Sequence, residues 1–277
     1  MNTSNQSYKE LAIPYFGEVF ESIDKVMHKH QISYYLIGAS AIALELLKEG
    51  VKPNRGTKDI DFAIMISSLD QYKEVGKSLL EEGFNKVKAP WTFYSERYNI
   101  VIDLLPFGEI EERDTVQFNN RFTDLHVLGF KEVLAHPQQV QIEEKLVNIP
   151  PLAGMIILKL VAWSDRPEER TNDLSDILQI IEHYFDYNFD EIVEHHNDIF
   201  PEEGFDQLRI AAEVLGRKSK IFLKKSERLS NRIYLVLQNN LTEQEQSVIA
   251  KKWARIKDWE IAYGFSILMA FKKGLEQ

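Results

Sequence analysis

The sequence predicts a mixed α/β (α+β) fold, with a mixed sheet and flanking helices over residues 1–150 and a helical domain over residues 151–277. In the first part, short apolar segments typical of strands alternate with helical periodicity. After Pro150 and Pro151 the helical periodicity continues and strand patterns become rare. A chain of 277 residues suits one large domain or two modest ones, and either is long enough to bury a core.

The elements before residue 81 are predicted from periodicity and from turn residues. Apolar side chains at three- and four-residue steps indicate helices, and short apolar or alternating segments indicate strands. Pro53, Asn54 and Gly56 indicate a loop. In chain order these patterns predict a helix over 11–30, a strand over 34–37, a helix over 39–48, a loop over 50–58, a strand over 59–66, and a helix capped by Ser67 that ends at Leu80.

The same patterns continue to the end of the first part. They predict a strand over 98–106, one or two strands over 116–128, a short helix over 130–135 and a strand pair over 140–149. Trp91, Phe93 and Tyr94 fall in a predicted loop. There we favour core packing or a hairpin tip over stacking on a base.

Composition excludes several classes of protein. The 33 Lys+Arg against 43 Asp+Glu give a net charge of −10, which argues against a protein that coats nucleic acid over its whole surface but allows a local basic patch. The absence of cysteine excludes disulfides and cysteine-based zinc sites. The polar N-terminus lacks a signal core, and no run of apolar residues is long enough for a membrane helix, so we expect a cytoplasmic protein.

The sharpest local pattern is a pair of aspartates on a predicted strand. Asp59 and Asp61 are two residues apart, so their carboxylates leave the same face of the strand. Asp103 is the one charge inside a second apolar strand, and it joins the pair if the two strands are neighbours. Three carboxylates about 4 Å apart repel by about 4 kcal/mol per pair at a dielectric of about 20. Protonation, basic neighbours or bound cations such as Mg²⁺ must offset this repulsion. The alternative places Asp59 and Asp61 on a solvated edge and pairs Asp103 with an arginine.

A glycine turn precedes this pattern. Gly38, Ala39 and Ser40 follow a strand and open a helix, where backbone N–H groups and the helix dipole favour a phosphate. Gly38 permits close approach of the backbone, and Ser40 offers a hydroxyl donor.

A third set lies in the helical part. Lys159, Trp163 and Arg166 are spaced to share one helix face. A tight turn at Pro167 would let Arg166 cluster with Asp173 and Asp176, and the alternative is an amphipathic helix pair with a surface ion pair.

Taken together, the strand, the glycine turn, the D-x-D strand and the third carboxylate resemble the nucleotidyltransferase superfamily founded on polymerase beta. The segments Arg55–Lys58, Leu158–Trp163 and Arg170–Leu178, with Arg166, resemble the AbiEii/AbiGii branch, in which some members are toxins of toxin–antitoxin systems. The resemblance covers residues 33 to about 186.

The resemblance implies a minimal nucleotidyltransferase core and an enzyme of the EC 2.7.7 type, which moves a nucleoside monophosphate from an NTP to an acceptor hydroxyl. It implies two Mg²⁺ ions, or Mn²⁺ in their place, with Asp59 and Asp61 binding both ions. Asp103 would hold the catalytic ion and help to deprotonate the acceptor, and Lys159 would neutralise the triphosphate. The implied nucleotide-binding residues are Gly38, Ala39, Ser40, Arg55, Lys58, Arg166, Asp173 and Asp176.

The implied partners are the NTP, an acceptor on tRNA or another RNA, and a cognate antitoxin, with no membrane. A basic stretch could meet the phosphates of such an RNA, or form a solvated helix face; it consists of Arg217, Lys218, Lys220, Lys224, Lys225, Arg228 and Arg232. Two alternatives stay open. One is a small-molecule nucleotidyltransferase of the aminoglycoside type, and the other is a catalytically inactive nucleotide-binding module.

Overall fold

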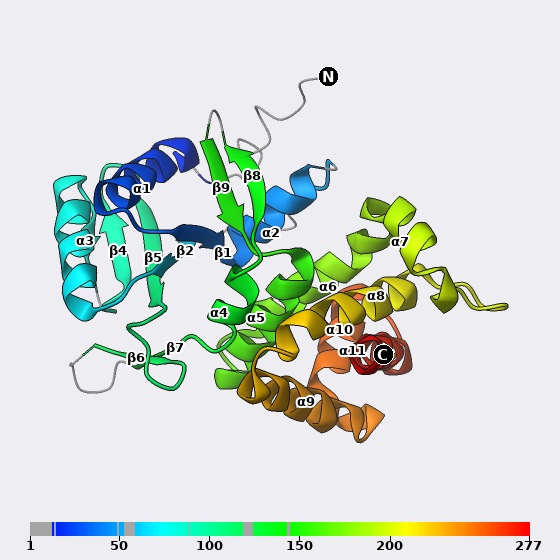
Figure 1. Ribbon diagram of the computed structural model, residues 1–277. Coiled ribbons are helices and arrows are strands. Elements are labelled where there is room, and N and C mark those ends of the chain that lie inside the picture. The colour runs from blue at the N-terminus through cyan, green and yellow to red at the C-terminus, as the bar shows by residue number, and fades with distance from the viewer. Residues whose placement is uncertain are drawn as a thin grey trace. The chain divides into compact units, whose positions relative to one another are not determined.

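The computed structural model describes residues 13, 15–48, 50–52, 59–87, 89–118, 124–142 and 145–277. The chain divides into two compact units, Met1–Pro151 and Leu152–Gln277 (Figure 1). The first unit combines a sheet with helices and the second consists of helices. The predicted mixed α/β fold is confirmed.

The sheet of the first unit has seven strands in the order β3-β4-β5-β2-β1-β9-β8. Strand β2 is parallel to β5, β1 is parallel to β9, and the other neighbours are antiparallel, so the sheet is mixed. Its strands are β1 (Tyr34–Ile37), β2 (Asp59–Met65), β3 (Asn85–Lys86), β4 (Thr92–Ser95), β5 (Ile100–Phe107), β8 (Gln138–Ile142) and β9 (Lys145–Ile149). A separate hairpin contains β6 (Thr115–Gln117) and β7 (Asp124–His126).

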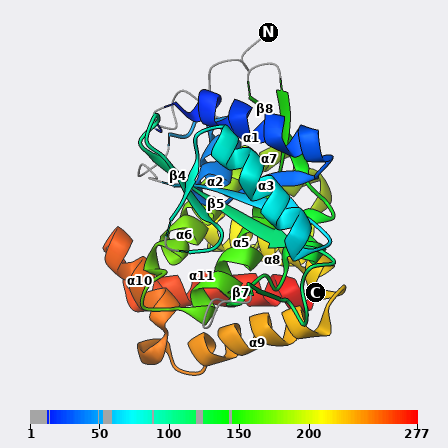
Figure 2. The ribbon, with the colours of Figure 1, turned by 90° about the vertical axis from the view of Figure 1, so that its left-hand side faces the viewer.

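Four helices accompany this sheet: α1 (Phe16–His30), α2 (Gly38–Leu47), α3 (Leu69–Glu81) and α4 (Phe130–Leu134). Helices α1 and α3 lie side by side (Figure 2) and are joined by an ion pair between Lys25 and Glu82. The apolar stripe of α1 packs on β2, where the rings of Phe20 and Phe62 are 6.5 Å apart. Because side chains alternate along a strand, Asp61 leaves β2 on the face opposite to Phe62. The carboxylates therefore lie on the face away from α1.

Several predicted boundaries are wrong. The helix predicted over 11–30 begins at Phe16, because Tyr15 before it adopts a left-handed φ of +59°. The cap of α3 is Ser68 and not Ser67, because the Ser68 hydroxyl accepts a hydrogen bond from the backbone N–H of Gln71. Ser67 instead donates its own hydroxyl to the side chain of Gln71. Strand β5 begins at Ile100 and not at residue 98, because Asn99 adopts a φ of +52° and breaks the extended backbone.

The loop predicted around residues 91–94 is also wrong in part. Phe93 and Tyr94 belong to β4, which pairs with β5. Phe93 is fully buried, so the favoured expectation of core packing is confirmed for this ring. Trp91 precedes the strand, is half-buried and packs against Phe118, with ring centroids 5.6 Å apart.

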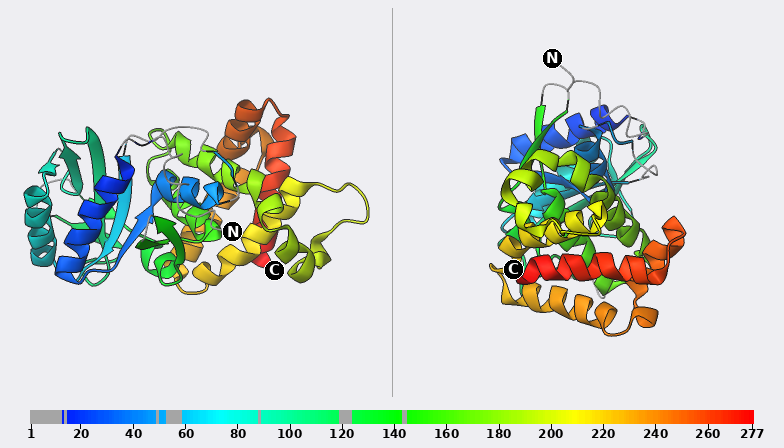
Figure 3. Two further views of the ribbon diagram at one scale, coloured as in Figure 1. Left: turned by 90° about the horizontal axis from the view of Figure 1, so that it is seen from above. Right: turned by 90° about the vertical axis from the view of Figure 1, so that its right-hand side faces the viewer.

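The second unit is a helical bundle whose elements are α5 (Leu152–Asp165), α6 (Thr171–Tyr187), α7 (Phe189–His195), η2 (Asn197–Ile199), α8 (Gln207–Leu223), α9 (Glu227–Leu241), η3 (Gln244–Gln246), α10 (Val248–Lys257) and α11 (Ile261–Glu276). Helix α11, red in Figure 3, packs along α8. Gly216 and Gly274 let the two backbones touch there. Helix α5 ends at Asp165, so Arg166 lies beyond it, and the predicted helix face shared by Lys159, Trp163 and Arg166 is wrong at its last position.

Among the described residues, no helix combines the length and the apolar character that a bilayer span requires.

Candidate functional site

Three aspartates converge on one face of the sheet. Strands β2 and β5 are parallel neighbours, and their register sets Asp61 opposite Asp103. Asp59 lies two residues before Asp61 and so shares its face. One carboxylate oxygen from each of the three lies within 4.8 Å of the other two. Asp59 is exposed and the other two are half-buried, so the cluster opens to solvent at the Asp59 end.

This cluster concentrates negative charge. Two carboxylates 4 Å apart at an effective dielectric of about 20 repel by about 4 kcal/mol, and solvent reduces the share of the exposed Asp59. The charge on Asp103 acts on the interior as well, because burial raises the pKa of Tyr72 and the Asp103 carboxylate raises it further. Tyr72 therefore stays protonated and donates its hydroxyl to the backbone oxygen of Leu104 at 3.1 Å. Such a cluster of hard oxygen donors suits a divalent cation.

Gly38 makes room for this cluster. Its φ is +70°, a left-handed conformation that glycine adopts at no steric cost. A Cβ at this position would lie 2.1 Å from Oδ2 of Asp61, which is closer than two atoms can approach. The close backbone approach expected of Gly38 is thus made to the Asp61 carboxylate. Any other residue would displace either α2 or Asp61.

The start of helix α2 lies beside the aspartates. Its N-cap residue, Ile37, has an apolar side chain and makes no capping hydrogen bond, so the cap residue itself leaves the first backbone N–H groups of the helix to other partners. Ala39 is half-buried, and Ser40 is 2% exposed. Among the described residues, the Ser40 hydroxyl has no hydrogen-bond partner. A buried hydroxyl without a hydrogen-bond partner is uncommon in folded proteins, and a bound ligand could supply the partner.

Arg55 and Lys58, which the resemblance places at the nucleotide, lie outside the described residues.

Lys159, Asp173 and Asp176 come together inside the second unit. The ammonium of Lys159 on α5 is 2.8 Å from Asp173 and 2.7 Å from Asp176, both on α6. Burial would lower the pKa of Lys159, but Asp176 and Asp173 outweigh it, so the pKa lies above its usual value. Burial likewise raises the pKa of Asp173, but Lys159 and Arg170 bring it below its usual value. Lys159 and Asp173 are therefore charged at neutral pH, and the three side chains join α5 to α6.

Arg166 does not join this cluster. It is exposed, and its guanidinium is 3.4 Å from Glu169. Arg170 takes the predicted place, with its Nε 2.8 Å from Asp173. Arg170 begins a segment that carries the family resemblance, but its place in this cluster was not predicted, although an arginine three residues before an aspartate at a helix start is a recognisable ion-pair spacing. The role at the nucleotide that the resemblance implies for Lys159, Arg166, Asp173 and Asp176 stays a prediction.

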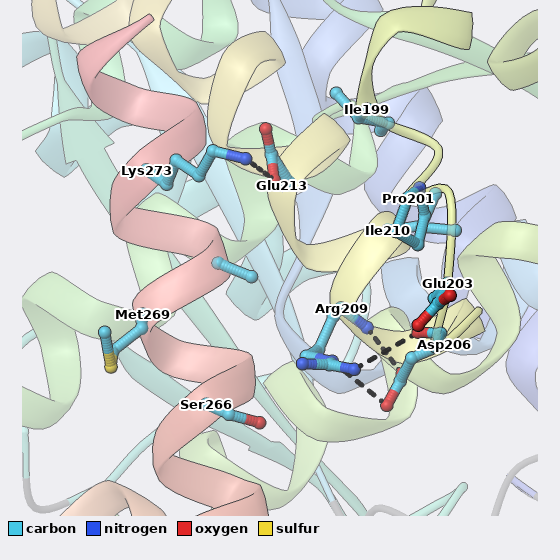
Figure 4. A pocket seen from close by; sticks show the side chains of 12 residues that line it. Ile199, Pro201, Glu203, Asp206, Arg209, Ile210, Glu213, Ser266, Met269 and Lys273 are labelled. Atoms are coloured by element: carbon cyan, nitrogen blue, oxygen red, sulfur yellow. Dashed lines mark hydrogen bonds and ion pairs between the residues drawn. The ribbon is translucent and has the colours of Figure 1, made fainter.

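A pocket of about 400 Å³ lies in the second unit between α8, α11 and the segment that follows η2 (Figure 4). Two of its carboxylates contact cations of the protein. Asp206 is 3.2 Å from Arg209, and Glu213 is 2.9 Å from Lys273 (Figure 4). Apolar side chains such as Ile210 line the rest. The pocket therefore offers a surface of mixed charge and not a convergence of carboxylates.

The basic stretch is partly neutralised by acidic neighbours. Arg217 is 2.6 Å from Asp198, and Lys218 contacts Glu191. Arg232 is 2.6 Å from Asp165. The stretch therefore offers less than its full formal charge to the phosphates of a nucleic acid.

Comparison with known proteins gives one family. A protein-family model described as "Nucleotidyl transferase AbiEii toxin, Type IV TA system" matches residues 28–258, which is most of the chain. Comparison with curated proteins gives no match.

Solved structures give more distant similarities. The structure of ANT(2'')-Ia in complex with adenylyl-2''-tobramycin is 13% identical, has a TM-score of 0.39, and covers 78% of this chain and 98% of that one. An antigenic nucleotidyltransferase-like protein from Paracoccidioides brasiliensis is 14% identical, has a TM-score of 0.39, and covers 79% of this chain and 91% of that one. Neither similarity is close enough to assign a site or a substrate.

Proposed function

Because the chain belongs to the AbiEii nucleotidyltransferase toxin family, we propose that it transfers a nucleoside monophosphate from an NTP to an acceptor hydroxyl, with divalent ions held by Asp59, Asp61 and Asp103. The observation that carries this proposal is the convergence of the three carboxylates within 4.8 Å beside Gly38. The proposed acceptor is an RNA hydroxyl, with tRNA as the first candidate, and the proposed partner is a cognate antitoxin.

The donor set fits Mg²⁺ or Mn²⁺. Both ions prefer oxygen ligands, and Mg²⁺ sites are commonly built from one or two carboxylates together with substrate phosphates. Bound ions would neutralise the aspartates and act as Lewis acids on phosphoryl oxygens. Asp59 is exposed and the other two carboxylates are half-buried, so the proposed site is open to solvent at the Asp59 end.

The chain's own groups then have distinct tasks. The start of α2, at Gly38, Ala39 and Ser40, offers backbone N–H groups and the positive end of a helix dipole to the β- and γ-phosphates. The Ser40 hydroxyl adds a donor. In the reaction, the acceptor oxygen forms a bond to the α-phosphorus while the bond to the pyrophosphate oxygen breaks. Asp103 is the proposed base that takes the proton of the acceptor hydroxyl.

The test uses the full chain with Mg²⁺, total RNA and each α-labelled NTP in turn. Asp61→Asn keeps the shape of the side chain and removes its charge, so we expect label transfer to fall at least about 100-fold, because several kcal/mol of transition-state stabilisation are lost. Asp70→Asn is the control, since Asp70 is exposed and its carboxylate contacts Lys73 on the surface of α3. It should transfer label as the wild type does.

The readouts separate the parts of the proposal. Full activity of Asp61→Asn contradicts the metal site. Label that appears on a small molecule and not on RNA contradicts the acceptor but not the transferase. Nucleotide binding without release of pyrophosphate indicates the inactive binding module instead.

A further inference from the structure

Strand β4 brings a hydroxyl to the aspartate cluster. Thr92 lies opposite Asp103 in the antiparallel pairing of β4 with β5, so both side chains leave the same face. The Thr92 hydroxyl donates to Oδ1 of Asp103, with the two oxygens 2.5 Å apart. A distance this short is typical of a hydroxyl bound to an ionised carboxylate.

We propose that Thr92 is a positioning residue for the metal site, which fixes the orientation of the Asp103 carboxylate through this hydrogen bond. The proposal rests on the function proposed above and adds to it a residue outside the three carboxylates. The reason is chemical: an aspartate side chain beside two other carboxylates is pushed away from them by charge repulsion. A hydrogen bond to one of its oxygens, Oδ1, opposes that rotation.

The backbone around Thr92 is arranged to hold the hydroxyl still. The N–H of Leu104 donates to the carbonyl of Trp91 at 2.8 Å, which makes the adjacent pair of Thr92 and Asp103 a non-hydrogen-bonded pair. Side chains approach each other more closely at such pairs. A β-branched residue also has few accessible χ1 rotamers.

Tyr72 adds a second restraint from helix α3. Its buried hydroxyl lies 3.1 Å from the carbonyl of Leu104 on β5 and 3.2 Å from the carbonyl of Pro90, just before β4. One group thus contacts β5 and the segment that leads into β4, next to the pair of Thr92 and Asp103. This contact opposes sliding of β4 along β5, which would separate the hydroxyl from the carboxylate.

A residue that orients a metal ligand has a measurable signature. Removing the hydrogen-bond partner of a metal-ligating side chain typically weakens metal binding by about 10- to 100-fold, although the metal-ligating residue itself is unchanged. A threonine that only packs in a strand would not change metal affinity when valine replaces it, because valine has a similar shape and favours strands.

The experiment titrates Mn²⁺ into the full chain without nucleotide and follows the free ion by electron paramagnetic resonance. We expect Thr92→Val to raise the Kd for Mn²⁺ by about 10- to 100-fold, Thr92→Ala to do the same, and Thr92→Ser to restore the wild-type value. Thr115→Val is the matched control, because Thr115 lies on β6 of the separate hairpin and its hydroxyl contacts His126. Its Kd should not change.

Two outcomes are decisive in different ways. If Thr92→Val and Thr92→Ala bind Mn²⁺ as tightly as the wild type while Asp103→Asn loses the ion, the positioning role is wrong and the proposed metal site stands. If the wild type and Asp103→Asn bind Mn²⁺ equally, the metal site itself is wrong and the role of Thr92 falls with it. Unchanged melting temperatures of the variants show that the differences do not arise from unfolding.

Discussion

The absence of one methyl group at Gly38 lets helix α2 begin beside Asp61. At +70°, φ lies in a region that other residues enter at a cost of about 1–2 kcal/mol. The clash with Asp61 is added to this cost, since a Cβ would lie 2.1 Å from its Oδ2. The two effects can be separated, because backbone strain acts on stability alone while the clash moves a proposed metal ligand.

We therefore expect Gly38→Ala to lose both stability and Mn²⁺ binding. Gly83→Ala provides the comparison, because Gly83 has a φ of +87° and a Cβ there would meet no described atom within 4 Å. It should lose about 1–2 kcal/mol from the strain alone and bind Mn²⁺ normally. Urea unfolding and Mn²⁺ titration of both variants test this. Equal Mn²⁺ binding by the two would show that Asp61 can move aside at no cost to the site.

The stability of the second unit depends on the side chain of Lys159. Its ammonium is buried between Asp173 and Asp176, so Lys159→Met leaves two buried carboxylates without it. Breaking a buried pair in this way costs about 3–5 kcal/mol. Arg170→Met also removes a cation from Asp173, but Arg170 is 40% exposed, so its contact is worth about 1 kcal/mol or less. Urea unfolding at pH 7 should therefore rank Lys159→Met well below Arg170→Met.

The cost of Lys159→Met should depend on pH with a definite sign. The pKa of Asp173 is lowered in the fold, so its contribution is present above the unfolded pKa of about 3.9 and is lost as the pH falls through the folded value. The pKa of Lys159 is raised, so its contribution is complete below about 10.4 and is lost only at higher pH. Without Lys159, burial raises the pKa of Asp173, so the carboxyl takes up a proton in the variant as the pH falls. The difference between wild type and variant should therefore be largest near neutral pH and shrink steadily in acid. A difference that grows in acid would contradict this account.

Among the elements, α8 and α11 touch at a contact that depends on glycine. A Cβ at Gly274 would lie 2.0 Å from the carbonyl oxygen of Glu213, which is backbone and cannot turn away. Gly274→Ala should therefore force the helices apart and cost at least about 1–3 kcal/mol, as overpacking does. In α3, the nearest atom to a Cβ at Gly76 is the flexible end of Lys86 at 3.4 Å. Gly76→Ala should instead gain about 0.5–1 kcal/mol from helix propensity. Chemical unfolding followed by circular dichroism compares the two, and a stabilising Gly274→Ala would contradict the contact.

Individual helices and strands also show how much of the fold the sequence could predict. Strand β2 was predictable because Ile60 and Phe62 alternate with Asp59 and Asp61, and a local alternation of this kind fixes which face each side chain takes. That Asp103 would lie beside them needed only the assumption that its strand is a neighbour, and the register confirms this proximity.

Strand β4 shows what local pattern could not give. It is four residues long, and its place depends on pairing with β5 and on the contacts of Tyr72, which are not local in sequence. Thr92 was therefore missed as a neighbour of Asp103. The prediction for Arg166 was wrong for a related reason. Periodicity alone extended the helix past Asp165, but α5 ends there, and Arg170 is the arginine that contacts Asp173.

For the molecule as a whole, the proposed metal site would set the stability of the free chain against metal binding. The three carboxylates repel one another, and a bound cation would relieve that repulsion. Sites that are arranged for function commonly reduce the stability of the free protein, and replacing one of their charged groups often gains about 0.5–2 kcal/mol. Replacing Asp61 would also remove a proposed metal ligand, so the effect of the substitution on stability should change sign when the metal is added.

We expect Asp61→Asn to be more stable than the wild type in a chelator and less stable in excess Mn²⁺. A wild-type chain at 100 times its Kd for Mn²⁺ gains about 2.7 kcal/mol by mass action, whereas a variant that does not bind gains nothing. Thermal unfolding of both chains in EDTA and across a Mn²⁺ series measures the melting temperature of each chain as a function of Mn²⁺ concentration. The curves of wild type and variant should cross. Asp70→Asn should run parallel to the wild type, because its exposed carboxylate lies outside the cluster and contacts Lys73. If the melting temperatures of Asp61→Asn and of the wild type rise equally with Mn²⁺, the Asp61 carboxylate is not a metal ligand and this account is wrong.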